Sequence, residues 1–307
     1  MKILLTGSSG MVGKNILDHF KSSKYKFLTP SRKELNLLDF QSTSKFLKSS
    51  KPEMVIHCAG VVGGIEANIR NPVKFLEENS YIGLNLIKAA NDNGINLFMN
   101  LASSCMYPKN ETNPLVEDSI LSGYLEPTNE GYALSKIIST KLCEYISNKN
   151  PIKKYKTVIP CNLFGKFDNF DDSSSHMIPG VIKKIHLANL KGINKVQIWG
   201  DGKSRREFMT ASSFADFVFY AIENFNNMPQ NINVGLGHDY TINEYYTAIA
   251  KTIGYRGKFE NDLSKPTGMR QKLVDITKLR SFGWNNKTSL QEGLTETYKY
   301  FKENHEL

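Results

Sequence analysis

The chain has 307 residues, a formal net charge of +9, 40% hydrophobic residues and 22% charged residues. This composition is ordinary for a folded globular protein and excludes a disordered one. No apolar run approaches the roughly 20 residues that a membrane helix needs, and residues 3–5 read as a first strand with no secretory leader ahead of them. The charge indicates either a solvated surface or a basic surface suited to small polyanions. We expect no nucleic-acid partner, because no basic stripe with aromatic residues is found.

The cysteines are scattered along the chain. They form neither a metal-ligand pair nor the dense pattern of a disulfide-stabilised secreted domain. We therefore expect a reducing, cytoplasmic compartment and no metal site. The four are Cys58, Cys105, Cys143 and Cys161.

Short apolar runs alternate with helical patterns in the first half of the chain. Asn71-Pro72 supplies a cap and a first-turn proline for the third helix, and Asn93-Gly94 ends it. Alternating strands and helices predict the α/β class, with a Rossmann-type, doubly wound parallel sheet and helices on both faces. The expected strands are residues 3–6, 26–29, 54–58 and 97–102, and the expected helices are residues 11–21, 41–48 and 73–92.

The alternation loosens in the second half, where the patterns predict a smaller, mostly C-terminal substrate-binding region. We expect a cofactor domain from residues 1–165 and about 213–240, and a substrate-binding region from about 166–212 and 241–307. The expected elements are a helix at 132–148, a strand at 156–160, a loop at 167–175, a helix at 178–188, an extended segment at 196–199, a helix at 211–224, a strand at 231–234 and mostly helix from 242 onward.

A glycine-rich turn joins the first strand to the first helix. Gly7, Gly10 and Gly13 allow a tight turn, a close approach to a pyrophosphate and close packing of helix on sheet. The pyrophosphate would rest on the helix N-terminus, where free N–H groups and the helix dipole favour an anion. Because the turn lies between a strand and a helix, it predicts a dinucleotide site that also includes Ser8, Ser9, Met11 and Val12.

The end of the second strand selects the cofactor. An enzyme that uses NAD usually places an acidic residue there, which binds the ribose hydroxyls. This chain instead has Arg32, whose guanidinium can bind a 2′-phosphate. NADP(H) is therefore the favoured cofactor; the alternative is that Arg32 is a solvated loop residue.

Tyr132 and Lys136 lie four residues apart on one helical face. The lysine's charge is expected to lower the pKa of the phenol, so that Tyr132 exchanges a proton with a carbinol or a ketone. Ser103 adds a hydroxyl at the end of the fourth strand, where open parallel sheets bind their ligands. With the glycine turn, this set resembles the short-chain dehydrogenase/reductase superfamily in its extended form, which acts on nucleotide sugars.

A closer resemblance, to the GDP-L-fucose synthase family, spans nearly the whole chain. That family epimerises and then reduces GDP-4-keto-6-deoxymannose. The matching stretches are Glu34-Leu35-Asn36-Leu37-Leu38-Asp39, Val62-Gly63-Gly64-Ile65, Ser103-Ser104-Cys105-Met106-Tyr107-Pro108, Leu125-Glu126-Pro127-Thr128-Asn129-Glu130, Asp168-Asn169-Phe170, Ser175-His176, Trp199-Gly200, Arg206-Glu207-Phe208 and Ser264-Lys265-Pro266.

The resemblance implies roles for individual residues. Ser103, Tyr132 and Lys136 would be the reduction triad, while Cys105 and His176 would be the acid/base pair that inverts carbons beside the ketone. The implied substrate contacts are Asn162, His176, Lys184, Trp199 and Arg206. The implied cofactor contacts beyond the glycine turn and Arg32 are Asn36, Leu37, Asp39, Ala59, Leu101, Ala102, Lys136, Pro160, Asn162 and Leu163.

Without the resemblance, other interpretations hold for several of these positions. Cys105 is then a small buried residue after a strand, and His176 a polar loop residue. Trp199 is then a core residue, and Arg206 belongs to a surface basic cluster that also contains Lys203 and Arg205.

The chain departs from the family pattern around the nucleotide and sugar. Ser9 stands where the family often has a basic residue near the 2′-phosphate, Lys184 replaces an arginine on the substrate side, and Thr267 replaces an aspartate. Thr210-Ala211-Ser212-Ser213 replaces the usual His-Val-Asp-Asp. These changes favour a related but different GDP-sugar.

The resemblance thus implies a homodimeric, NADPH-dependent enzyme of surface-polysaccharide biosynthesis. Its reaction would be reduction at C4 of a GDP-4-keto-6-deoxy sugar, with epimerisation at C3 and C5. One alternative is C4 reduction of a related GDP-4-keto sugar, such as a 3,6-dideoxyhexose or a 6-deoxyheptose, with partial or no epimerisation. Another is a redox-silent protein that binds a dinucleotide.

Overall fold

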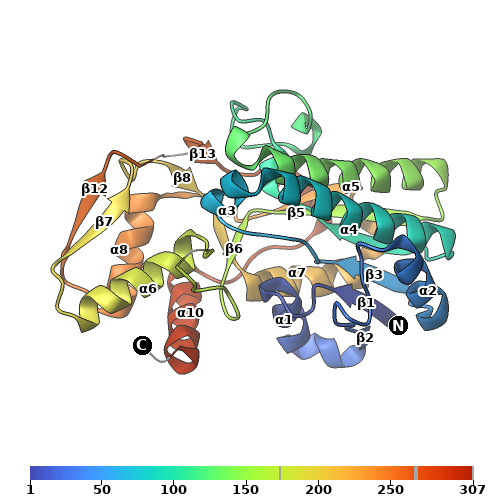
Figure 1. Cartoon of the computed structure of the whole chain (residues 1–307), viewed down its shortest axis with the longest axis horizontal. Coiled ribbons are helices and arrows are strands. Elements are labelled where there is room, and N and C mark those ends of the chain that lie inside the picture. The colour runs from blue at the N-terminus through green and yellow to red at the C-terminus, as the bar shows by residue number, and fades with distance from the viewer. Residues whose placement is uncertain (173, 266–268, 306–307) are drawn as a thin grey trace.

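The fold is centred on a six-stranded parallel sheet, seen in a computed structural model that describes residues 1–172, 174–265 and 269–305 (Figure 1). The strand order is β10-β5-β4-β3-β1-β2, and each neighbouring pair is parallel. The predicted Rossmann-type α/β class is therefore confirmed. The strands are β1 (Lys2–Thr6), β2 (Lys26–Leu28), β3 (Met54–His57), β4 (Leu97–Leu101), β5 (Lys154–Pro160) and β10 (Asn231–Val234).

Helices cover both faces of this sheet. Alternate strand residues point to opposite faces, so that Leu4 packs in one apolar cluster while Ile3 and Leu5 pack in another. All three side chains are fully buried. One face is covered by α2 (Phe40–Ser50), α4 (Pro72–Asp92) and α5 (Glu130–Lys149), and the other by α1 (Met11–Asp18) and α7 (Ala211–Glu223) (Figure 1).

The strand order reverses at β1. The chain passes from β1 to β2 on one side and returns to β3 on the other. In open α/β sheets, ligands bind outside the carboxyl ends of the strands at such a reversal. The turns that follow β1 and β3 are therefore the expected floor of a binding site.

A second apolar core lies beside the sheet, at the other end of the long axis in Figure 1. It is built from side chains of α6, α8, α10 and the short strands between them, with Phe164 and Phe208 at its inner end. The elements that build or adjoin it are β6 (Asn162–Phe164), α6 (Met177–Leu190), β7 (Lys195–Trp199), β8 (Arg205–Arg206), β9 (Phe208–Thr210), β11 (Tyr240–Thr241), α8 (Ile242–Ile253), β12 (Lys258–Asp262), β13 (Gln271–Lys272) and α10 (Leu290–Asn304). Within the described residues, the α-helices not yet named are α3 (Ile65–Arg70) and α9 (Thr277–Phe282).

Several sequence predictions need correction. The first helix ends at Asp18, because His19 is extended, with φ −70° and ψ 138°. Helix α3 was not expected, and the segment after residue 242, expected to be mostly helical, contains β12 and β13. Pro72 does occupy the first turn of α4, but the Asn71 side chain does not cap it; its amide donates to the carbonyl oxygen of Ala67 at 3.3 Å.

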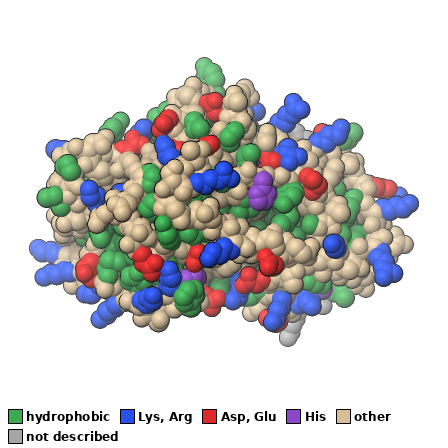
Figure 2. All heavy atoms as spheres, turned by 180° about the vertical axis from the view of Figure 1, so that it is seen from behind, with side chains coloured by type: hydrophobic (Ala, Val, Ile, Leu, Met, Phe, Trp, Pro, Cys, Tyr) green, Lys and Arg blue, Asp and Glu red, His purple; other side chains and the backbone are tan. Residues whose placement is uncertain are grey.

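Charge is dispersed over the face shown in Figure 2, where lysines and arginines are interspersed with acidic residues. This pattern agrees with a solvated surface. Within the described residues, no helix combines the length and apolar character that crossing a membrane requires. The described part of the chain also holds no group of three His, Cys, Asp or Glu side chains arranged to bind a metal ion.

Candidate active site

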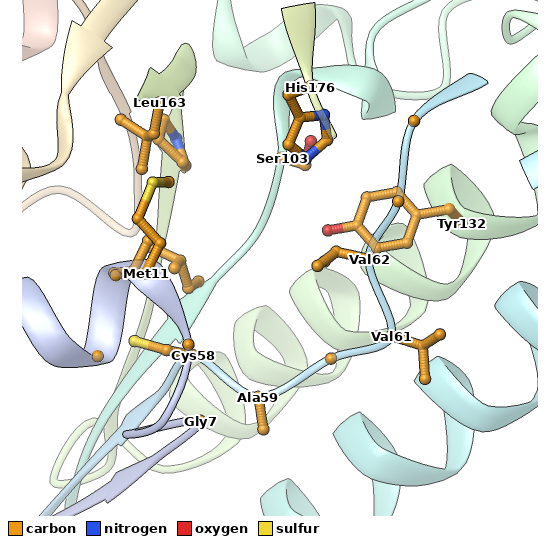
Figure 3. Close-up of a pocket in the computed structure, with 18 of the residues that line it drawn as sticks. Gly7, Met11, Cys58, Ala59, Val61, Val62, Ser103, Tyr132, Leu163 and His176 are labelled. Atoms are coloured by element: carbon orange, nitrogen blue, oxygen red, sulfur yellow. The ribbon is translucent and has the colours of Figure 1, made fainter. Parts of the chain in front are cut away.

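A cavity of about 1380 Å³ opens along the carboxyl ends of the sheet strands and continues to the second apolar core. Single ligand pockets usually measure about 300–1,000 Å³, so this one has room for two ligands. Its walls include the glycine turn at one end, Tyr132 in the middle, and His176 and Trp199 at the other end. Figure 3 shows the middle of the cavity, where the hydroxyl of Tyr132 points into the open space.

The glycine turn fits a pyrophosphate. Gly7 has φ +71°, and a Cβ there would lie 2.7 Å from the backbone nitrogen of Ala59 in the turn after β3. A Cβ on Gly13 would lie 2.3 Å from the carbonyl oxygen of Gly7. A Cβ on Gly10 would meet no protein atom closer than 3.4 Å, so this glycine leaves space for a ligand. No side chain caps α1, so its first N–H groups can bind an anion.

The turn after β2 carries Arg32 into the cavity wall. Arg32 is exposed. The neighbouring Ser31 donates both its backbone N–H and its hydroxyl to one carboxylate oxygen of Glu34, at 2.7 and 2.8 Å, which fixes the shape of this turn. Ser9 lies on the same end of the cavity. Arg32 is therefore free to pair with a phosphate group.

Asn79 holds the loop after β3. This buried side chain accepts from the Val61 N–H at 2.8 Å and donates to the Val61 carbonyl at 3.0 Å. A Cβ on Gly60 would lie 3.0 Å from Oδ1 of Asn79 and 3.7 Å from Nζ of Lys136. The loop thus passes close to the triad lysine. Sequence reasoning missed Asn79, although a buried polar residue within the apolar pattern of α4 was a signal.

The triad residues come together around the end of β4. The Lys136 ammonium donates to the Leu101 carbonyl at 3.1 Å and lies 5.6 Å from the centroid of the Tyr132 ring. The Ser103 hydroxyl oxygen accepts from the Cys105 N–H at 3.4 Å. Figure 3 shows Ser103 and Tyr132 on the same side of the cavity as His176. The arrangement can present two hydroxyl groups to one oxygen atom of a bound carbonyl compound.

The expected effect of Lys136 on Tyr132 is not found. Burial raises the pKa of Tyr132 above its usual value, with a further increase from Cys105. Burial also lowers the pKa of Lys136. The ammonium donates to the Leu101 carbonyl, and burial of the phenol is the larger influence on its pKa. In this structure Tyr132 is a protonated phenol, which is the form that donates a proton to a ketone oxygen.

Basic and aromatic side chains form the far wall of the cavity. Lys184 of α6 donates to the Gln197 carbonyl at 3.0 Å, and burial lowers its pKa. Trp199 ends β7 and is 49% exposed, with the Lys265 ammonium 5.3 Å from its ring centroid. Arg206 also faces the cavity, and its guanidinium donates to the Arg205 carbonyl at 2.7 Å. This wall suits an anionic ligand with a planar base.

His176 stands at the N-terminus of α6 and lines the cavity. Although the side chain is open to the cavity, the surrounding protein desolvates it and lowers its pKa. Cys105 is only 6% exposed and does not belong to the cavity lining, although its backbone N–H donates to the Ser103 hydroxyl oxygen. Burial raises the pKa of its thiol, while the nearby Lys272 ammonium opposes that increase. Nothing in the sequence pattern had indicated Lys272.

Most expected ligand contacts line this cavity, and they remain predictions until a ligand is bound. Asn162 also lines it, and its amide donates to the Glu207 carbonyl at 2.8 Å. Asp39 does not line it; its carboxylate instead caps α2 by accepting from the N–H groups of Gln41 and Ser42. Pro266 and Thr267 lie outside the described residues. The expected cofactor contacts in the lining are Gly7, Ser8, Ser9, Gly10, Met11, Val12, Gly13, Arg32, Asn36, Leu37, Ala59, Leu101, Ala102, Lys136, Pro160, Asn162 and Leu163.

A family model described as the NAD dependent epimerase/dehydratase family matches residues 3–235. The chain belongs to this family. Its match in the family model covers the glycine turn, the triad and β10, and ends just after the last strand of the parallel sheet.

Several proteins resemble the chain over nearly its whole length. It is 61% identical to a GDP-L-colitose synthase of Yersinia pseudotuberculosis, over 98% of both chains. It is 44% identical to a GDP-L-fucose synthase of Azorhizobium caulinodans, over 98% of this chain and 96% of that one. A Campylobacter jejuni GDP-D-glycero-L-gluco-heptose synthase, solved in the presence of NADPH, matches with a TM-score of 0.90 and 29% identity over 98% of both chains.

Proposed function

We propose that this protein uses NADPH to reduce C4 of a GDP-4-keto-6-deoxy sugar and epimerises C3 and C5 in the same site. The observation that carries the proposal is the single cavity that joins the glycine turn, Tyr132 and the wall formed by Lys184, Trp199 and Arg206. It has the length and the charge for a dinucleotide at one end and a nucleoside diphosphate sugar at the other. The full-length relatives named above support the same class of reaction.

In the reduction, NADPH supplies the hydride. The glycine turn and Arg32 hold the cofactor. Ser103 donates a hydrogen bond to the ketone oxygen, and Tyr132 transfers its phenolic proton to that oxygen as the alcohol forms. Lys136, which is fixed to the Leu101 carbonyl, keeps its ammonium 5.6 Å from the centroid of the Tyr132 ring while this proton is transferred.

In the epimerisation, protons leave and return at carbons next to the ketone. Burial raises the pKa of Cys105 and lowers that of His176, so the resting pair at neutral pH is a thiol and a neutral imidazole. The imidazole accepts a proton from one face, and the thiol returns a proton to the other. The inversion leaves an imidazolium and a thiolate, which are respectively the acid and the base needed for a second inversion in the opposite sense. Cys105 must move toward the cavity for this step, since its side chain is buried and does not line the cavity.

A second candidate is a 3,6-dideoxy sugar. The 61% identity with a colitose synthase favours it, because colitose is a 3,6-dideoxyhexose. Such a sugar has two hydrogens at C3 and therefore no stereocentre there. Only inversion at C5 would then change the product.

A panel of GDP-4-keto sugars tests these assignments. It contains the 6-deoxy, 3,6-dideoxy and 6-deoxyheptose compounds, with NADPH consumption followed by absorbance and products identified by NMR. We expect the 6-deoxy or 3,6-dideoxy sugar to give the highest kcat/KM. A preference for the heptose without inversion would establish a C4 reductase alone, and no NADPH consumption with any sugar would indicate a redox-silent binding protein.

We further propose a cytoplasmic homodimer that supplies an activated sugar for a surface polysaccharide. The free state of Cys58, Cys105, Cys143 and Cys161 supports a reducing compartment.

For the dimer, the adjacent helices α4 and α5 expose large apolar side chains, with Val73 72% and Tyr145 65% exposed. Light scattering after size-exclusion chromatography tests it; Tyr145→Glu should shift a dimer toward the monomer mass, and a wild-type monomer would contradict it.

The division into a cofactor domain (1–165 and about 213–240) and a substrate-binding region (about 166–212 and 241–307) is also a proposal. The separate apolar core around α6, α8 and α10 supports it. Limited proteolysis with mass spectrometry tests it: the first cuts should fall near residue 166 or 241.

A further inference from the structure

Glu207 lies where the chain passes from β8 to β9. In this extended segment the side chains alternate. Arg206 and Phe208 line the cavity, whereas Glu207 points away from it and is fully buried. Strand β8 pairs with β11 and β13, and β9 pairs with β6. Glu207 therefore occupies the junction between two small sheets, directly behind the wall that carries Arg206.

The carboxylate of Glu207 accepts three backbone N–H groups. One oxygen accepts from Leu236 and Gly237, the latter at 2.9 Å, and both follow β10 of the central sheet. The other accepts from Val274, which follows β13, at 3.0 Å. A Cβ on Gly235 would lie 2.5 Å from the carboxylate, so a glycine leaves the space that this group fills.

The main chain of Glu207 makes a fourth connection. Its carbonyl oxygen accepts from the backbone N–H of Asn162 at 3.2 Å and from the Asn162 side-chain amide at 2.8 Å. One residue thus joins the segments after β5, β10 and β13 to the strand that carries Arg206. Asn162 and Arg206 belong to the cavity lining on either side of this junction.

We propose that Glu207 is a positioning residue that sets the distance between the cofactor sheet and the nucleotide-sugar wall. It does so by fixing Arg206 and Asn162 relative to the ends of β5 and β10. This inference rests on the proposed function, in which those two side chains contact the GDP-sugar. Glu207 itself is not expected to touch either ligand, since its carboxylate accepts from three backbone N–H groups and it does not line the cavity.

As a carboxylate, Glu207 offers acceptors to all three donors and presents no hydrogen of its own; burial raises its pKa to about 7, and the three N–H groups oppose that rise by favouring the ionised form. Glutamine has the same shape but places an NH₂ group against at least one backbone N–H. Two donors then face each other in a buried site, which pushes the segments apart. Glu207→Gln therefore tests the hydrogen bonds of this junction with little change in side-chain shape.

The experiment compares Glu207→Gln with wild type, using GDP binding by calorimetry and NADPH binding by fluorescence. We expect the Kd for GDP to rise at least about tenfold, which is about 1.4 kcal/mol, and the Kd for NADPH to change less than about twofold. In turnover, KM for the GDP-sugar should rise while kcat falls much less. Gly235→Ala places a methyl group against the same carboxylate and should give the same pattern of binding changes. It replaces Glu207→Gln in the experiment if that variant does not fold.

Glu117→Gln is the matched control. Glu117 is also buried, accepts the N–H of Asn233 in β10 at 2.8 Å, and does not line the cavity. This variant should lower the melting temperature without changing the Kd for GDP. Equal GDP affinity in wild type and Glu207→Gln would overturn the inference. So would a loss of both GDP and NADPH binding in proportion to the loss of protein stability. Wild-type protein that binds NADPH but not GDP would instead contradict the proposed function.

Discussion

The ammonium of Lys136 donates a hydrogen bond to the carbonyl oxygen of Leu101, 3.1 Å away. This bond attaches helix α5 to the end of β4, two residues before Ser103. The helix that carries Tyr132 and the strand end that carries Ser103 are therefore held together by the triad's own lysine. The bond gives the buried ammonium of Lys136 an uncharged partner, a backbone carbonyl.

The first prediction concerns cofactor choice. Arg32→Ala should weaken NADPH binding about tenfold or more, because a hydrogen bond between charged groups contributes on the order of 1.5–3 kcal/mol. NADH lacks the 2′-phosphate, so its Kd should change little. Fluorescence titration measures both. The neighbouring Lys33→Ala, at an exposed position outside the cavity lining, is the control; equal losses for both cofactors would remove Arg32 from this role.

Tyr132→Phe should abolish reduction and leave NADPH binding nearly intact, because the ring remains while the proton donor is lost. General acid catalysis contributes about 10²–10⁴-fold to rates, and kcat should fall by that order. Stopped-flow absorbance of NADPH measures it. Tyr107→Phe removes another buried hydroxyl, one bonded to Asn233 outside the cavity, and should lower stability without this loss of kcat. A Tyr132→Phe enzyme with most of its turnover would require a different donor.

His57 should make the fold sensitive to acid. This buried ring shares a hydrogen bond of 2.8 Å with the Thr6 hydroxyl, and burial lowers its pKa to about 3. Between pH 6.5 and about 3 the unfolded chain binds a proton here that the folded chain does not, so the free energy of unfolding falls as the pH drops. Urea unfolding at pH 7 and pH 5 should show a smaller difference for His57→Gln than for wild type.

His238→Gln is the control for this effect, since His238 is exposed and should leave the pH dependence unchanged. If His57→Gln and wild type lost the same stability on acidification, the acid sensitivity would lie in other groups.

Cys105 and His176 should move protons at carbon and take no part in hydride transfer. Turnover in heavy water should incorporate deuterium at C5, and at C3 for a sugar with an exchangeable hydrogen there, as NMR detects. Cys105→Ser should suppress this incorporation and give a reduced product without inversion. His176→Asn should block inversion while tolerating reduction. A wild-type product without deuterium at C3 or C5 would mean that the protein is a reductase alone.

Much of the fold follows from local patterns. The apolar runs of β1, β3 and β4 and the long apolar stripe of α4 identify buried elements, because each signal lies within one segment. The short strands β8, β11 and β13 escaped prediction for a physical reason. They contain two residues each and exist only because they pair with one another across distant segments.

In the candidate site, too, local sequence patterns predict some residues, whereas residues that depend on long-range contacts are missed. The glycine turn and the Tyr132–Lys136 pair have characteristic spacings, so the sequence alone indicates them. Asn79 and Glu207 form hydrogen bonds with backbone groups that are distant in the sequence. A sequence motif with a fixed spacing does not reveal such partners. The pKa of Tyr132 was predicted in the wrong direction, because a sequence shows a neighbouring charge but not the depth of burial.

The strand β10 completes the central sheet only after about seventy residues of other structure have been made, since β5 ends at Pro160 and β10 begins at Asn231. During synthesis on the ribosome, the N–H and C=O groups along the edge of β5 therefore remain unpaired until β10 has emerged. The segment made in that interval contains α6, β7 and the chain leading to Glu207. A nascent chain stalled before residue 231 would expose a sheet edge open to pairing with other chains, which makes this interval the stage at which aggregation is the greatest hazard.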